Sequence, residues 1–227
     1  MDVPNKVRRT RLFRNLHDAR EYFFRNLHDA REYSRWIKRS YGPPSPQRVK
    51  QAVLARNALP GAVWVETGTF LGETTEFLAS MSPTVYSIEP EPTLASEATE
   101  HFKDRPHVTI IQGLSEGALP ELLPTLSGDI NFWLDGHFSE GITFQGPKDT
   151  PILDELECIR DNIKNFGNVR IMIDDVRCFN PTVPDYSSYP SLAMVLEALE
   201  NMGLTWHIEH DLLIAQSQES RKSCPRM

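Results

Sequence analysis

Short apolar runs alternate with amphipathic segments between residues 62 and 202. Five runs are rich in β-branched or aromatic residues and only four or five residues long, a pattern typical of buried strands. Segments with helical spacing separate them, and this alternation predicts a parallel sheet with helices on both faces. The predicted strands are 62–66, 84–88, 108–111, 130–134 and 169–173, and the predicted helices are 73–81, 93–103, 118–126, 152–166 and 191–202.

The C-terminal pattern differs from this alternation. Two apolar runs at 204–209 and 212–215 are separated only by His210 and Asp211, which predicts an antiparallel hairpin. The sequence therefore predicts an α/β fold of the Rossmann-like type. Its sheet would have seven mostly parallel strands, a C-terminal antiparallel hairpin and flanking helices.

The N-terminal region carries a perfect tandem repeat. Phe13–Tyr22 and Phe24–Tyr33 both read FRNLHDAREY, with a period of 11 residues. Eleven residues make almost three helical turns, so the repeat predicts a helical arm with an apolar stripe. A proline-rich segment at 41–46 ends this helix. We expect an arm at 1–46, a catalytic domain at 47–216 and a polar tail at 217–227.

The charge is unevenly distributed. Residues 1–50 hold 13 Lys/Arg and 5 Asp/Glu and the remainder 11 and 26, so balances of +8 and −15 combine to −7. Because the arm also carries acidic residues at helical spacing, we expect it to dock on its own acidic body or on a second copy. A homodimer through the arm is the partner hypothesis, and binding to nucleic acid is not expected.

Composition excludes several classes of protein. No apolar run approaches the roughly 18 residues that span a bilayer, and the N-terminal segment lacks the apolar core of a secretory signal. Cys158, Cys178 and Cys224 are too few and too widely spaced for a disulfide framework or a zinc site. The expected location is the cytoplasm.

A glycine turn follows the first predicted strand, in the segment ETGTFLGETT at 66–75. A strand–glycine–helix turn lets the backbone approach a ligand and presents free N–H groups at the helix N-terminus. The segment matches neither the phosphate-binding P-loop nor the GxGxxG dinucleotide fingerprint. A tight turn without a ligand remains an alternative at this level.

Polar side chains also follow the second and third strands. Glu89 ends the second strand about 20 residues after the glycine turn, where a carboxylate can accept both hydroxyls of a ribose. Its neighbour Glu91 is expected to be more exposed. The third strand leads into a polar turn at 112–116 that is placed to meet an adenine edge. Three consecutive strand ends thus suit one adenosyl ligand.

Five motifs in order resemble those of class I S-adenosylmethionine-dependent methyltransferases. They are ETGTFLGETT, SIEPEP, IIQGLSEGALPELL, NFWLDGHFSEG and IMIDDV, and the resemblance, which covers about residues 62–215, is greatest to the metal-dependent O-methyltransferases of the macrocin and catechol type. It implies that S-adenosylmethionine is the cofactor. It also implies that Glu66, Gly68, Thr69 and Gly72 border its methionine half, that Glu89 holds the ribose, and that Gly113, Leu114 and Ser115 border the adenine.

Three aspartates follow the fourth and fifth strands. Asp135, Asp174 and Asp175 are expected at one edge of the sheet, where three carboxylates repel one another unless a cation or protons intervene. Ligand sets made only of oxygen favour Mg²⁺, Ca²⁺ or Mn²⁺ over zinc. The resembling enzymes hold a metal at these positions, which makes Mg²⁺ the expected ion. In the alternative, Asp135 contacts only the cofactor, and Asp174 and Asp175 cap the following turn.

His137 lies two residues beyond Asp135 and is the candidate general base. A loop-bonding or metal-ligating histidine is the alternative. The predicted reaction is metal-assisted methyl transfer to a hydroxyl of a small polyhydroxylated acceptor, a sugar by analogy only. Two other functions stay open: a metal-dependent hydroxylase-like enzyme on the same sheet, and a non-catalytic binding or assembly module.

Overall fold

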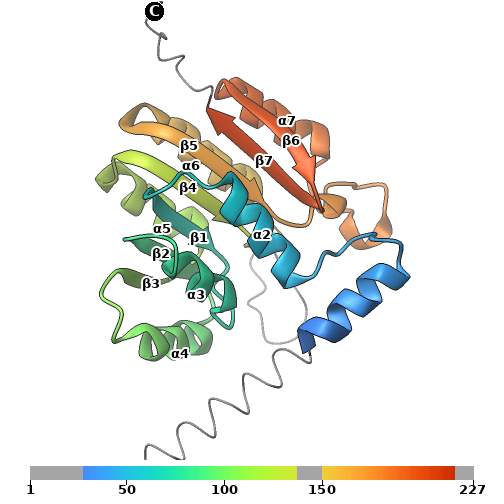
Figure 1. Cartoon of the computed structure of the whole chain (residues 1–227). Helices are drawn as coiled ribbons and strands as arrows, with labels where there is room; N and C mark the ends of the chain where they lie inside the picture. The colour runs from blue at the N-terminus through green and yellow to red at the C-terminus, as the bar shows by residue number, and fades with distance from the viewer. Residues whose placement is uncertain (1–27, 137–149, 218–227) are drawn as a thin grey trace, which may run out of the picture. The chain divides into compact units, whose positions relative to one another are not determined.

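A central β-sheet organises the larger of two compact units, Gln51–Met227, and the smaller unit is Met1–Lys50 (Figure 1). The computed structural model describes residues 28–136 and 150–217. The sheet has seven strands in the order β3-β2-β1-β4-β5-β7-β6. The strands are β1 Val63–Thr67, β2 Val85–Glu89, β3 Val108–Gln112, β4 Gly128–Leu134, β5 Phe166–Ile173, β6 Leu204–Glu209 and β7 Leu212–Ser217.

The predicted fold class is confirmed. Strands β1 to β5 pair in parallel, whereas β7 pairs antiparallel with both β5 and β6. The turn between β6 and β7 consists of His210 and Asp211, which both have positive φ values of 49° and 68°. Two consecutive residues of this kind form the mirror-image turn that matches the twist of a hairpin, as the two-residue spacing predicted.

Of the helices that the structure describes after residue 46, five were predicted and one was not. The missed helix, α2, is polar and buries only Val53 and Leu54. The prediction of one helix over 152–166 was wrong at its end, because a 3₁₀ turn follows α6 and β5 already begins at Phe166. The helices are α2 Gln47–Asn57, α3 Glu73–Ala79, α4 Pro92–Phe102, α5 Ser115–Leu122, α6 Ile152–Asn162 and α7 Leu192–Asn201, with 3₁₀ turns η1 Leu123–Thr125, η2 Ile163–Asn165, η3 Val176–Cys178 and η4 Pro184–Tyr186.

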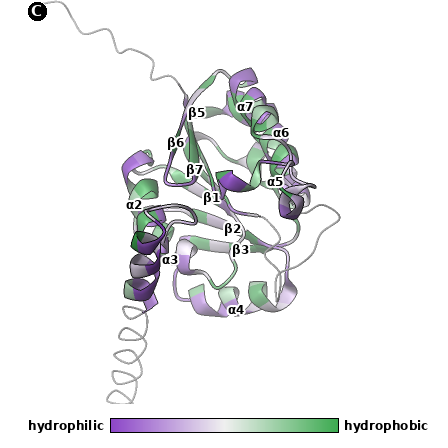
Figure 2. Cartoon of the chain, turned by 90° about the vertical axis from the view of Figure 1, so that its right-hand side faces the viewer, coloured by the Kyte–Doolittle hydropathy of each residue, from purple (hydrophilic) through white to green (hydrophobic). Residues whose placement is uncertain are grey.

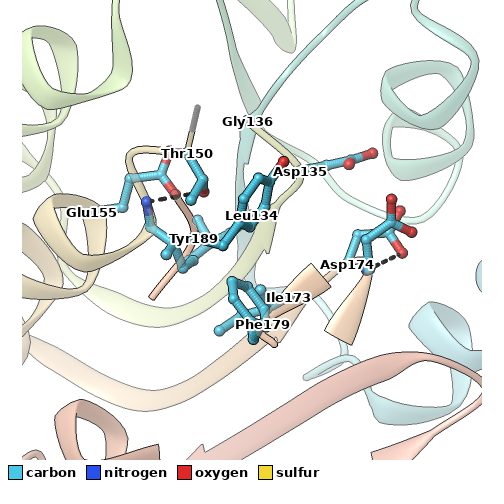
Figure 3. A pocket seen from close by; sticks show the side chains of 11 residues that line it. Leu134, Asp135, Gly136, Thr150, Glu155, Ile173, Asp174, Phe179 and Tyr189 are labelled. Carbon is cyan, nitrogen blue, oxygen red and sulfur yellow. Dashed lines mark hydrogen bonds between the residues drawn. The ribbon is translucent and has the colours of Figure 1, made fainter. Parts of the chain in front are cut away.

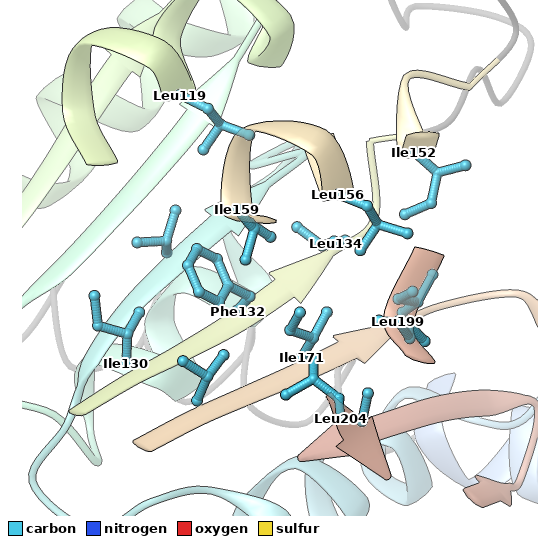
Figure 4. Close-up of a cluster of buried hydrophobic side chains, with 14 of the residues drawn as sticks. Leu119, Ile130, Phe132, Leu134, Ile152, Leu156, Ile159, Ile171, Leu199 and Leu204 are labelled. Atoms are coloured by element: carbon cyan, nitrogen blue, oxygen red, sulfur yellow. The ribbon is translucent and has the colours of Figure 1, made fainter. Parts of the chain in front are cut away.

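The central strands are apolar throughout because both faces of the sheet are covered. Figure 2 shows α5, α6 and α7 on one face and α2 and α3 on the other. In β4, Phe132 packs into the cluster on the first face, whereas the adjacent Trp133 packs into the cluster on the second. Burying such side chains stabilises the fold by about 1.5–3 kcal/mol each. The first cluster is drawn in Figure 4 and includes Leu119, Ile130, Phe132, Leu134, Leu156, Ile159, Ile171 and Leu199.

Residues 28–38 of the smaller unit form a helix, in line with the second copy of the repeat. The helix ends before Ser40 and Tyr41, whose φ values of 55° and 64° are incompatible with its continuation. The first repeat and the C-terminal tail from residue 218, which includes Cys224, lie outside the described residues. Cys158 and Cys178 are free thiols, and no helix in the described ranges is long and apolar enough to cross a membrane.

Candidate functional site

The strand order reverses between β1 and β4, so the connections after these two strands lead to opposite sides. In open parallel sheets, this switch point at the carboxyl ends of the strands is where ligands bind. Gly68 follows β1 with a φ of 87°, and a Cβ built on it would lie only 2.6 Å from the carbonyl oxygen of Asp135. Glycine is therefore required here, because the two strand ends meet backbone to backbone.

Glu66 is a fully buried carboxyl group beneath this turn. Its Oε2 accepts hydrogen bonds from the hydroxyls of Thr75 and Ser87, both at 2.6 Å. Its Oε1 has no hydrogen-bond partner in the described part of the chain. Burial raises the pKa of Glu66 to about 8; the two hydroxyls oppose this shift, and the charges of Asp135 and Glu89 add to it.

Glu89 ends β2 and holds the loops on either side of it. One oxygen accepts a hydrogen bond from the backbone N–H of Phe70 at 2.7 Å, and the other accepts one from Glu91 at 3.0 Å. Glu89 is 4% exposed. Glu91 is more exposed, as expected, and caps α4 by accepting the N–H of Leu94 at 2.8 Å. Glu89, the predicted ribose ligand, thus connects the glycine turn to the start of α4.

The remaining predicted cofactor residues lie on the same edge. Thr69 is buried, and its hydroxyl is 2.6 Å from that of Ser87. Gly72 precedes α3 with a φ of 77°. Gly113 donates its N–H to the carbonyl of Glu89, so the end of β3 adjoins the end of β2. Leu114 and Ser115 then start α5, with Ser115 buried.

A pocket opens beside this edge, between the ends of β4 and β5 and the start of α6 (Figure 3). Asp135 and Asp174 stand at the two strand ends. Tyr189 lines the pocket, and its ring lies 6.3 Å from that of Phe179. Tyr186 instead packs on Tyr189, at 5.8 Å between ring centres. The lining residues are Leu134, Asp135, Gly136, Thr150, Ile152, Glu155, Ile173, Asp174, Asp175, Phe179 and Tyr189.

The three aspartates do not form a prearranged metal site. Asp175 makes a two-pronged ion pair with Arg177, at 2.6 and 3.0 Å, and Arg177 also binds Asp211 from the β6–β7 turn. Asp174 accepts the backbone N–H of Asp175 at 2.8 Å. Their oxygens and those of Asp135 are not all within 4.8 Å of one another; among described residues only His28, Asp29 and Glu32 meet that condition.

Arg177 is therefore the cation that this edge already contains. Burial lowers its pKa, but the pairs with Asp175 and Asp211 outweigh burial and raise the pKa above its ordinary value. The residue was missed in the sequence because its second partner lies 34 positions further on, in a turn. His137, the predicted base, lies outside the described residues.

Glu155 on α6 was also missed. It is 1% exposed and lines the pocket, yet an acidic residue in the first turn of a helix is ordinarily a solvated partner of the helix dipole. A Cβ built on Gly136 would lie 3.1 Å from its Oε1 and 3.2 Å from the hydroxyl of Thr67. Gly136 thus leaves room for two polar atoms at the end of β4.

No protein-family profile matches the sequence, and a search of curated proteins found no match. Solved structures do match. The N-methyltransferase NodS from Bradyrhizobium japonicum WM9 is 17% identical, with a TM-score of 0.50 over 75% of this chain and 94% of NodS. This chain has the Rossmann-like methyltransferase fold.

Two further solved structures have lower scores. The 23S rRNA methyltransferase ErmE is 13% identical, with a TM-score of 0.49 over 77% of this chain and 68% of ErmE. Fibrillarin from Aeropyrum pernix, with bound S-adenosyl-L-methionine, is 15% identical, with a TM-score of 0.47 over 75% of this chain and 74% of fibrillarin.

Proposed function

We propose that this chain binds S-adenosylmethionine at the switch point and transfers its methyl group to a small acceptor. The main support for this proposal is the cluster of Glu66, Glu89 and Asp135 around the glycine turn. Burial raises the pKa of Glu66, and the charges of Asp135 and Glu89 add to this effect. One oxygen of Glu66 has no partner among described residues. A ligand with a sulfonium, an ammonium and a ribose diol would bring positive charge to this acidic cluster and a donor to Oε1 of Glu66.

The roles of the individual residues follow from their positions on the sheet edge. Gly68 lets the turn after β1 approach the end of β4 closely, and we place the ligand across these two strand ends. Glu89 still has acceptor capacity for a diol, because each of its oxygens accepts one backbone hydrogen bond. We assign Glu66, Gly68, Thr69 and Gly72 to the methionine half, Glu89 to the ribose, Gly113, Leu114 and Ser115 to the adenine, and Asp135 to the junction with the acceptor pocket.

The bound cofactor supplies an electrophilic methyl group on a positively charged sulfur. The contribution of the chain is to orient the acceptor in line with that methyl group and to remove a proton from the attacking atom. The pocket between β4 and β5 adjoins the cofactor edge through Asp135, which borders both. We therefore assign this pocket to the acceptor.

The resemblance in sequence makes a hydroxyl of a polyhydroxylated molecule one candidate acceptor, with His137 as base and Mg²⁺ on Asp135, Asp174 and Asp175. The geometry of these aspartates does not fit that metal site, since Arg177 holds Asp175 through two hydrogen bonds. The proposed reaction therefore uses no metal. By analogy with NodS, an N-methyltransferase, nitrogen is the other candidate acceptor atom.

A thermal-shift comparison tests the proposal. S-adenosylhomocysteine should raise the melting temperature, because a ligand that binds only the folded state stabilises it. Adenosine should raise it less, since it lacks the amino-acid half that Glu66 would face. A shift with NAD⁺ but none with S-adenosylhomocysteine would overturn the proposal in favour of a dinucleotide enzyme.

A further inference from the structure

Glu155 is a buried acceptor without a full set of donors. Its side chain reaches from α6 toward the end of β4 (Figure 3), and its Oε1 has no hydrogen-bond partner within the described residues. The hydroxyl of Thr67 is also buried beside Gly136. Burial raises the pKa of Glu155 to about 7, and the nearby hydroxyls of Ser115 and Thr67 only partly offset it. An unsatisfied buried acceptor costs about 1–3 kcal/mol, more when charged, so this position favours a ligand that brings a donor.

The other pocket residues restrict the class of ligand. Carboxylates of Asp135 and Asp174 line the same pocket, and ionised carboxylates only accept hydrogen bonds. The guanidinium of Arg177 is held by Asp175 and Asp211. Phe179 and Tyr189 add aromatic rings, whose faces attract cations. An acidic pocket with aromatic walls therefore suits a positively charged group better than a neutral one.

We propose that this pocket binds the ammonium group of an amine, that Glu155 accepts its N–H, and that this amine is the methyl acceptor. The last part rests on the proposed function, whereas amine binding does not. Nitrogen is then the acceptor atom, and Glu155 is the group that receives its proton.

This methyl transfer needs no reactant other than the amine and S-adenosylmethionine. The ammonium gives one proton to the Glu155 carboxylate and becomes a neutral amine with a free electron pair. That pair forms the bond to the methyl carbon, the carbon–sulfur bond breaks, and its electrons remain on the sulfur of S-adenosylhomocysteine. The product is a methylated ammonium ion, and Glu155 then releases its proton to solvent.

Two probes of the same shape separate charge from size: phenethylamine, a cation near neutral pH, and the neutral 2-phenylethanol. We expect the protein to bind phenethylamine at least about tenfold more tightly, equivalent to about 1.4 kcal/mol. Glu155→Gln should remove most of this preference while keeping the side-chain shape. The matched control is Glu157→Gln, on the exposed face of the same helix, which should retain it.

Equal affinity for the two probes, or no measurable amine binding at millimolar concentration, would overturn the inference in the wild-type protein without any variant. A preference that survives in folded Glu155→Gln would show that the group at residue 155 merely contacts a buried water. Titrations with and without S-adenosylhomocysteine keep the two proposals separate. Amine preference in a protein that fails to bind S-adenosylhomocysteine would refute the proposed function alone.

Discussion

Gly68 and Asp135 meet backbone to backbone at the switch point of the sheet. A Cβ on residue 68 would lie 2.6 Å from the Asp135 carbonyl oxygen. The φ of 87° at this position is one that residues other than glycine rarely adopt. This contact fixes how closely the glycine turn approaches the end of β4. The glycine turn after β1 and the pocket at the ends of β4 and β5 are therefore close neighbours.

Gly68→Ala should lower the free energy of unfolding by about 2 kcal/mol or more, because both the contact and the backbone conformation oppose a side chain. Denaturant unfolding followed by circular dichroism measures the change. Gly117→Ala is the matched control, since a Cβ at Gly117 in α5 meets nothing within 4 Å. That variant should be neutral or slightly stabilising, because alanine favours a helix. Equal stability of the two variants would contradict the close approach at Gly68.

The buried carboxyl of Glu66 should make stability depend on pH. Its pKa is about 8 in the folded protein, above its ordinary 4.5, so the folded state binds the extra proton between these values. Its contribution to stability is full below about pH 4.5 and is lost as the pH rises through 8. The groups facing it are the hydroxyls of Thr75 and Ser87 and the carboxylates of Asp135 and Glu89.

Glu66→Gln removes this titration, so its stability relative to the wild type should increase as the pH is raised from 5 to 9. The gain should be on the order of a few kcal/mol at most. Melting temperatures measured at several pH values test this. Glu73→Gln, an exposed change on the adjacent helix, is the control and should follow the wild type. A constant difference between Glu66→Gln and wild type at all pH values would contradict a raised pKa.

The ion-pair network of Arg177 should be structural. Asp175 and Asp211 have side chains only 10% and 6% exposed, so Arg177→Ala leaves two buried carboxylates without their counterion. We expect a loss of about 3–5 kcal/mol, the usual effect of breaking a buried pair. Arg160→Ala, which removes an exposed pair on α6, should cost about 1 kcal/mol or less. Similar losses in both variants would contradict the network.

Mg²⁺ and EDTA should each leave the wild-type melting temperature unchanged, because Arg177 already pairs with Asp175. Thermal denaturation with each additive measures this directly. The opposite result is specific: a Mg²⁺-induced increase that disappears in Asp174→Asn and Asp175→Asn would restore the metal site that the sequence predicts.

The sheet was predictable because its strands are buried on both faces, which makes each a short continuous apolar run. The hairpin was predictable because only His210 and Asp211 separate its strands. Helix α2 was missed because Val53 and Leu54 are its only buried residues, too few to produce a helical apolar pattern. Local signals therefore identified the elements that form the core and missed the one that barely contributes to it.

The site was only partly predictable. Glu66 is the penultimate residue of β1 and Glu89 is the last residue of β2, so the fold class alone places them on one edge. Glu155 lies in sequence among first-turn acidic residues, and only the packing of α6 against β4 reveals that it is buried. The ion pair between Asp175 and Arg177 was equally hard to predict from the sequence. Arg177 also pairs with Asp211, which lies in the distant hairpin turn. Contacts between distant segments decide charge pairing, and the sequence pattern does not encode them.

In the proposed function, the edge formed by Glu66, Glu89 and Asp135 holds S-adenosylmethionine. Calorimetric titration of S-adenosylhomocysteine into wild type, Glu89→Ala and Glu97→Ala tests it most directly. Glu97 is an exposed residue on α4 and serves as the control. We predict binding to wild type and Glu97→Ala, and an affinity at least about tenfold lower for folded Glu89→Ala, which loses charge-assisted bonds to the ribose. Absence of binding to the wild type, or unchanged affinity in folded Glu89→Ala, would contradict the account.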